Sequence, residues 1–166
     1  MKKRYVIIPT VCITFFFLVF LLLRFLNTFS GSYHYAEWYI FEKSKDRLII
    51  DVTDLKNQNP DYKVVIPLKS GGTEEFPDKY INYYYICRFY LKNREITLSC
   101  VIAGNDSISK IGLVSSKKKY SGTVRLVNKE LSREENNEIK KLFETEILDK
   151  LGKWQRKPKN WSDYLK

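Results

Sequence analysis

The chain of 166 residues contains a single histidine, His34, and only three cysteines. Histidine-based catalytic triads and histidine-ligated zinc sites both need a well-placed imidazole, and a zinc site needs several ligands. The cysteines, which are Cys12, Cys87 and Cys100, lack the CxxC spacing that is typical of thiolate metal sites. The composition therefore argues against triad hydrolysis and against zinc, and we expect no metal site.

Glycine is also scarce, and no phosphate-binding loop is present. Gly71 and Gly72 are not followed by the GK[ST] sequence of such a loop, so they predict a turn. The acidic pair Asp51 and Asp54 predicts a solvated helix face, and a second acidic pair at residues 74–75 predicts a loop. The two catalytic carboxylates of a glycosidase can come from positions far apart in a sequence, so this kind of enzyme stays an alternative. We expect a non-enzymatic protein without a cofactor, with a cell-wall-acting enzyme as the least favoured alternative.

What the sequence does contain is one long apolar run near its start. Residues 6–23 are uncharged and are followed by Arg24. Because about 20 apolar residues cross a bilayer, residues 5–26 predict a transmembrane helix, with residues 1–4 as a cytoplasmic stub and 27–35 as a juxtamembrane linker. A cleaved signal peptide is the alternative, but its apolar core is about 7–15 residues long and ends at small residues.

Charge predicts the orientation and the kind of partner. Three basic residues in the N-terminal stub place that end in the cytoplasm, which predicts a single-pass bacterial inner-membrane protein with a periplasmic domain. The net charge is +10. Outside the membrane such a charge favours an acidic protein, anionic lipid or cell-wall polymers, and we expect no nucleic acid. The alternative is a lysine-rich surface that only keeps the domain in solution.

Residues 36–152 predict one α+β domain. Ser44 is a candidate helix N-cap, and apolar residues at helical spacing predict a helix at 45–58. The β-branched content of residues 48–53 favours a strand there instead, and both alternatives stay open. Turn-type residues separate the predicted strands, which are 36–42, 62–68, 80–91, 95–103, 107–116 and 120–128.

The last element of the domain is a helix. Ser132 and Glu135 form a capping box, apolar residues then recur on one face, and Gly152 is a C-terminal stop. We expect this helix to lie across an antiparallel sheet of about four to six strands. Residues 153–166 follow as a basic tail that contains tryptophan.

The segment around residues 80–103 predicts a β-hairpin. A two-residue turn at 93–94 places Cys87 opposite Cys100, at a non-hydrogen-bonded pair where the Cα atoms approach to about 4.5 Å. That separation permits a disulfide, and the alternative is two buried thiols that act as small hydrophobes. The same alternation places Tyr84, Arg88 and Tyr90 on the opposite face of the hairpin, where they would form an aromatic and basic patch.

Two further groups complete the candidate interaction surface. A predicted hairpin turn carries Lys117, Lys118, Lys119 and Tyr120. The basic tail carries Trp154, Arg156, Lys157 and Trp161. Tryptophan beside lysine suits a protein-binding hot spot and also contact with anionic lipid headgroups. The alternative for the tail is that its tryptophans fold back onto the domain.

Three stretches resemble small uncharacterised bacterial envelope proteins. These stretches are DLKNQNPDYKV, YINYYYICRFYL and LSREENNEIKKLFETEIL. The resemblance covers about half of the chain and contains no known active site. It implies an α+β domain that an N-terminal segment holds outside the cytoplasmic membrane, and it assigns no functional residue.

Together these features predict a membrane-anchored, non-catalytic domain that binds another protein. One biological form is an immunity or inhibitor protein that neutralises a toxin in the periplasm. The first alternative is an accessory subunit of an envelope or secretion assembly, and the second is the cell-wall enzyme mentioned above.

Overall fold

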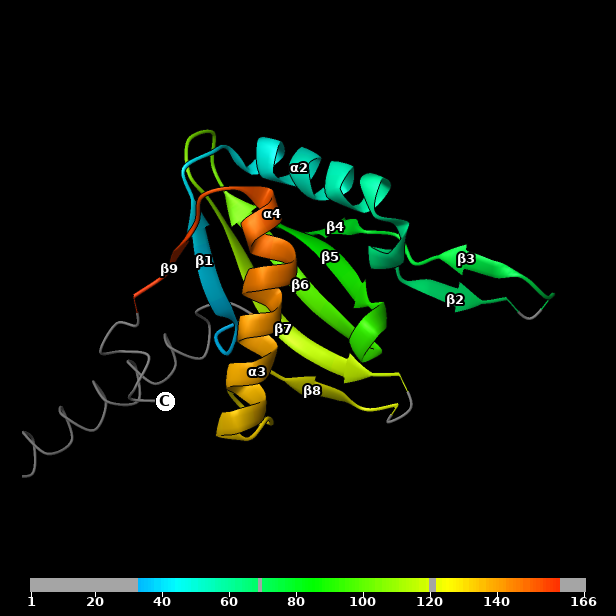
Figure 1. The fold of residues 1–166 in the computed structure, drawn as a ribbon. Helices are drawn as coiled ribbons and strands as arrows, with labels where there is room; N and C mark the ends of the chain where they lie inside the picture. The colour runs from blue at the N-terminus through cyan, green and yellow to red at the C-terminus, as the bar shows by residue number, and fades with distance from the viewer. Residues whose placement is uncertain (1–32, 69, 120–121, 159–166) are drawn as a thin grey trace, which may run out of the picture. The chain divides into compact units, whose positions relative to one another are not determined.

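The computed structural model describes residues 33–68, 70–119 and 122–158. The chain divides into two units, residues 1–34 and residues 35–166, and all the helices and strands given below belong to the second unit. This unit is rich in sheet, and its described part also contains two continuous helical segments (Figure 1).

The main sheet has seven antiparallel strands in the order β4-β5-β6-β7-β1-β9, and β8 pairs with the end of β7. Its strands are β1 (Glu37–Phe41), β4 (Lys79–Ile81), β5 (Tyr84–Leu91), β6 (Ile96–Gly104), β7 (Ser109–Lys118), β8 (Val124–Leu126) and β9 (Gln155–Arg156). A separate two-stranded sheet forms an arm from β2 (Val65–Pro67) and β3 (Thr73–Glu75). Two short 3-10 turns lie at Pro60–Tyr62 and Lys92–Arg94.

Local sequence accounts for both helices. Helix α2 (Lys45–Gln58) begins where the Ser44 hydroxyl accepts the backbone N–H of Arg47, which resolves the helix-or-strand alternative for this segment as a helix. Helix α3 (Arg133–Phe143) begins with a capping box between Ser132 and Glu135. It continues through a π-helical turn (Glu144–Leu148) into α4 (Asp149–Leu151).

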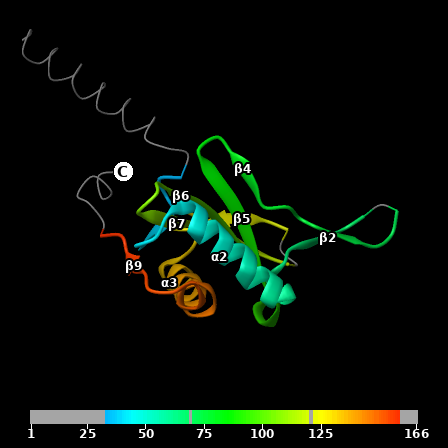
Figure 2. The ribbon, with the colours of Figure 1, turned by 90° about the horizontal axis from the view of Figure 1, so that it is seen from above.

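The core lies between one face of the sheet and the helices. Alternate residues of β1, β5, β6 and β7, such as Phe41, Phe89 and Leu98, are fully buried. They pack with buried helix residues such as Leu48 of α2 and Phe143 of α3. Figures 1 and 2 show α2 and the α3–α4 helix on the same side of the sheet. The opposite face carries no helix of the described part of the chain.

The β5–β6 hairpin has the predicted register but a different turn. Cys87 lies opposite Cys100, and Leu91 and Ile96 close the hairpin, so the turn comprises residues 92–95. Glu95 occupies the left-handed region there, with φ of 50°. Lys92 and Glu95, which flank the predicted turn, form ion pairs with other residues: Lys92 with Asp61 and Glu95 with Lys119.

The longer turn changes the pairing type of the two cysteines. Arg88 donates its backbone N–H to Asp78 Oδ1 on the β4 side, at 3.1 Å. Because successive strand residues direct their N–H groups to opposite sides, Cys87 directs its own toward β6. Cys87 and Cys100 therefore form a hydrogen-bonded pair, not the predicted non-hydrogen-bonded one. Both thiols are buried and free in the structure, and the disulfide stays a prediction.

The predicted fold needs two corrections, and the first is the number of strands. The main sheet has seven strands and not four to six. A turn at residues 82–83, with Asn82 at φ of 53°, divides the strand predicted at 80–91 into β4 and β5. In addition, Gln155 and Arg156 of the predicted tail pair with β1 as β9.

The second correction concerns the membrane. None of the helices that the structure describes has the length and apolar character needed to span a bilayer. Helix α2 has 14 residues. The continuous helical segment of α3, the π-helical turn and α4 is longer, but it carries many charged residues. The predicted transmembrane segment, residues 5–26, lies outside the described residues. The predicted single-pass architecture and inner-membrane location are therefore not supported by the structure.

Candidate recognition surface

The sheet face opposite the helices, which we call the open face, is the main candidate for a functional surface. Because side chains alternate along a strand, it consists of the residues that lie between the core positions. Its apolar and aromatic members include Trp38, Ile40, Ile81, Tyr84, Ile86, Tyr90, Val101, Ala103 and, on β8, Val124 and Leu126. No described helix covers them, so their exposed parts are available to a partner (Figure 2).

Charge on the open face has one sign. Its basic residues are Lys79, Arg88, Lys110, Lys117 and, just after β9, Lys157. None of the described strand positions that point this way carries a carboxylate. The buried Glu37 of β1 points the other way, because it alternates with Trp38, and it pairs with Lys140 of α3 at 2.7 Å. The open face therefore presents an uncompensated positive potential around an apolar centre.

Trp38 has a special place on this face because a glycine lies beside it. Its partner across the strands is Gly112 of β7, and a Cβ atom at Gly112 would come within 2.9 Å of the indole ring. The indole therefore packs directly on the backbone of β7. Val101, the next residue across the sheet from Gly112, is only 1% exposed although it faces away from the helices.

Two lysines lie beside Trp38. Lys110 Nζ is 4.7 Å from the centre of the indole ring, a distance at which an ammonium group and an aromatic ring attract each other. Lys157 donates its backbone N–H to the carbonyl oxygen of Trp38 at 2.8 Å. Burial lowers the pKa of Lys110, and the charge of Lys157 lowers it further. Lys157 was a candidate surface residue from the sequence, but its place beside Trp38 and Lys110 was not anticipated.

Tyr84, Arg88 and Tyr90 lie on the open face, as the hairpin alternation predicts. All are half-buried. The guanidinium carbon of Arg88 lies 4.2 Å from the centre of the Phe76 ring, while its Nη1 atom is buried and has no hydrogen-bond partner among the described residues. The Phe76 ring therefore helps to hold this cation in place.

The predicted lysine cluster divides between the two faces of the sheet. Lys117 is exposed and pairs with Thr97 of β6 on the open face. Lys118 pairs with the core residue Ile96 and therefore points to the helix side. Lys119 forms an exposed ion pair with Glu95 at 3.2 Å. Tyr120, the fourth predicted member, lies outside the described residues.

The described part of the tail contributes mainly to packing. Trp154 contacts Tyr39 edge to face, with the ring centres 5.3 Å apart, and its Nε1 donates to Asp149 at 2.9 Å. Arg156 forms ion pairs with Glu144 and, at 3.8 Å, with Glu37. Trp154 therefore folds back onto the domain, which was the alternative for the tail. Trp161 lies outside the described residues.

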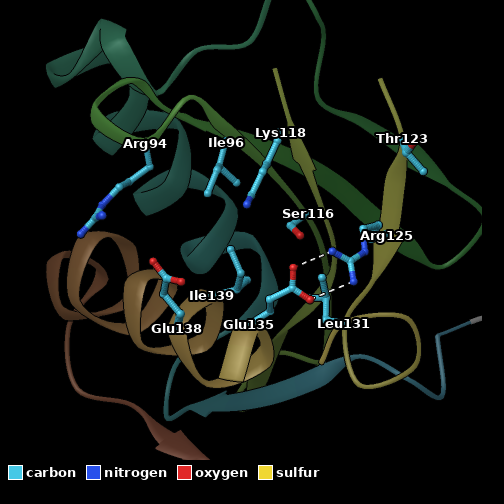
Figure 3. A pocket seen from close by; sticks show the side chains of 10 residues that line it. All are labelled: Arg94, Ile96, Ser116, Lys118, Thr123, Arg125, Leu131, Glu135, Glu138 and Ile139. Atoms are coloured by element: carbon cyan, nitrogen blue, oxygen red, sulfur yellow. Dashed lines mark hydrogen bonds and ion pairs between the residues drawn. The ribbon is translucent and has the colours of Figure 1, made fainter. Parts of the chain in front are cut away.

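A cavity of about 250 Å³ lies on the helix side, between the start of α3 and strands β7 and β8 (Figure 3). Arg125 and Glu135 face each other in it through two hydrogen bonds of 2.6 and 2.8 Å. The hydrogen bond from Arg125, followed by that from the Ser132 backbone, lowers the pKa of Glu135 to about 2. Because the charges of Arg125 and Glu135 neutralise each other, we assign this cavity a structural role.

Neither side of the sheet brings together the groups of a metal site. The described residues contain no cluster of three or more histidine, cysteine or acidic side chains that could bind a metal ion. Comparison with protein-family models, curated proteins and solved structures gives no match. The open face itself is therefore the basis for a functional proposal.

Trp38, Lys110 and Gly112 are the surface residues that sequence reasoning missed. The sequence contained one indication of the position of Trp38. It alternates with apolar residues in the predicted strand at 36–42, which places it on the face opposite to theirs. The pairing of β1 with β7 was not predictable, since the two strands are separated by most of the domain. Without that pairing, nothing links Trp38 to the glycine and the lysine that surround it.

Proposed function

We propose that this domain is a non-catalytic binding module whose open face recognises a protein with an acidic surface. The observation that supports this proposal is a helix-free sheet face with an apolar centre, basic residues around it and no carboxylate at its described strand positions. Aromatic residues and arginine are enriched in protein interfaces. Charge complementarity accelerates the encounter of such surfaces and suppresses wrong partners.

A basic sheet face with aromatic residues also resembles surfaces that bind single-stranded nucleic acid. Those surfaces stack bases on exposed rings. Here the centre of the face is aliphatic, with the half-buried Ile40 and Ile86, and the indole of Trp38 already contacts Gly112 and Lys110. The aliphatic centre favours an apolar protein surface, so nucleic acid becomes an outcome that the experiment must exclude.

Two biological forms of this function remain proposals. In the first, the domain is an inhibitor or immunity protein that covers the active surface of a toxic enzyme. In the second, it is an accessory subunit that holds an assembly together. They differ in one measurable respect: binding abolishes the partner's activity in the first form and leaves it intact in the second.

The test compares two variants of the full-length protein. The first replaces Ile86 and Tyr90 of the open face with serine. The matched control replaces Asn137 and Lys141, both exposed on α3, with serine. Wild-type protein is used to capture partners from the host cell, the captured protein is purified, and its affinity for each variant is measured by calorimetry.

We expect the open-face variant to bind about tenfold or more weakly and the α3 control to bind as the wild type does. Circular dichroism and thermal unfolding verify that both variants fold. Loss of binding in the control alone would contradict the proposal. So would a captured partner that disappears after nuclease treatment, because the open face would then bind nucleic acid.

A further inference from the structure

The lysines beside Trp38 raise the question of what balances their charge. Neither Lys110 nor Lys157 forms an ion pair with a carboxylate among the described residues. By contrast, Lys56, Lys119 and Lys140 each have an acidic partner. Two like charges near each other without a counter-ion are unfavourable, the more so when one is half-buried.

Strand pairing explains why the two lysines come together. Ile40 of β1 lies between Lys110 of β7 on one side and Gln155 of β9 on the other. Lys157 then follows β9 and bonds to the next open-face residue of β1, Trp38. The two lysines thus reach the same part of the open face from strands on either side of β1. A half-buried lysine that is also repelled by a neighbour retains its proton less readily, as the lowered pKa of Lys110 shows.

We infer that Trp38, Lys110 and Lys157 form the subsite of the open face that binds a carboxylate side chain of the partner protein. This inference rests on the proposed function and adds the chemistry of the group recognised. The indole provides a flat apolar wall, and the two ammonium groups provide hydrogen-bond donors and the missing counter-charge. The acidic residue of the partner would lie next to apolar residues that contact Ile40 and Ala103.

A carboxylate fits these surroundings better than a phosphate group does. Ile40 and Ala103 are the open-face neighbours of Lys110 in the sheet, and a doubly charged group would have to lose more water there. Phosphate recognition also commonly uses the planar fork of arginine, and the cations of this subsite are both lysines. The test therefore includes a phosphate-bearing probe.

The test uses the full-length protein and short synthetic peptides as probes. The first peptide alternates glutamate with valine, the second has glutamine in place of glutamate, and the third has phosphoserine. Lysine side chains are labelled by reductive ¹³C-methylation, which keeps their charge, and are followed by NMR. We expect the glutamate peptide to shift the signals of Lys110 and Lys157 and to raise the pKa of Lys110 toward its usual value, and we expect no such change with the glutamine peptide.

Matched variants separate the subsite from the general charge of the face. The variant Lys110→Gln with Lys157→Gln should bind the glutamate peptide about tenfold more weakly. The control Lys79→Gln with Lys117→Gln removes the same charge from the same face and should change the affinity less than about threefold.

Equal losses in both double variants would overturn the subsite and leave the open face as a diffuse acidic-protein surface. Tighter binding of the phosphoserine peptide would overturn the carboxylate assignment. Shifts confined to lysines of the helix side, such as Lys141, would overturn both the subsite and the proposed function.

Discussion

Lys56, in the last turn of α2, forms a buried ion pair with Asp78, the residue immediately before β4. The two side chains are only 6% and 12% exposed. Asp78 also accepts the backbone N–H of Arg88, and Lys56 Nζ lies 5.0 Å from the centre of the Phe89 ring. This pair ties the helix layer to the β4–β5 hairpin, which carries part of the open face.

Asp78→Asn should destabilise the domain by about 3–5 kcal/mol, because it leaves the buried Lys56 without a counter-charge. Urea unfolding followed by circular dichroism measures the change. The control is Asp61→Asn, which breaks an ion pair with Lys92 whose side chains are 67% and 69% exposed, and it should cost no more than about 1 kcal/mol. Adding Lys56→Met to Asp78→Asn should restore part of the loss. Similar losses in both single variants would show that the Lys56–Asp78 pair is not desolvated in solution.

The capping box of α3 predicts a dependence of stability on pH. The pKa of Glu135 is lowered from 4.5 to about 2 in the folded domain, so this carboxylate stabilises the fold at pH values above its ordinary pKa. That contribution is lost as the pH falls from about 4.5 through 2, since in this interval the unfolded chain takes up a proton at this carboxylate that the folded protein does not. Glu135→Gln should reduce the slope of stability against pH in this window, measured by urea unfolding at a series of pH values.

The control for this prediction is Glu138→Gln, a change at an exposed residue of the same helix. It should leave the slope unchanged between pH 2 and 4.5, the interval given by the two pKa values of Glu135. An equal effect of the two variants would indicate that the net charge of α3, and not the hydrogen bonds of Glu135, causes the pH dependence.

The two free thiols predict a response to oxidation. Cys87 and Cys100 are fully buried, and burial, followed by the hydrogen bond with Cys87, raises the pKa of Cys100 well above its ordinary value. We therefore expect neither thiol to react with Ellman's reagent until the protein is unfolded. A hydrogen-bonded strand pair places the Cα atoms about 5.5 Å apart, which lies inside the range for a disulfide.

Refolding under oxidising conditions should then yield an intramolecular disulfide that stabilises the domain by about 3 kcal/mol in the chain-entropy model. Mass spectrometry detects the bond, and urea unfolding with and without reductant measures its effect. Cys100→Ser serves as the control, because it should show no dependence on the reductant. Oxidation that gives only cross-linked dimers would contradict the expected geometry.

Local sequence determined several elements of the domain. Ser44 and the Ser132–Glu135 box define where α2 and α3 begin, because a cap is a contact between residues three positions apart. The β5–β6 register followed from the alternation of apolar residues, since a shift by one residue would turn every side chain to the other face. The predicted register is correct although the predicted turn is wrong. A turn at 93–94 and a turn at 92–95 have the same midpoint, so both give the same pairs of residues.

Tertiary structure alone decided the functional surface. The sequence places Trp38, Lys110 and Lys157 in three separate segments, and only the insertion of β1 between β7 and β9 brings them together. The same pairing placed Gly112 beneath the indole and drew Arg156 of the predicted tail into the sheet. Such contacts depend on which distant strands pair. The free energy that favours one pairing over another comes from the burial of the whole core. No local pattern of residues carries that information.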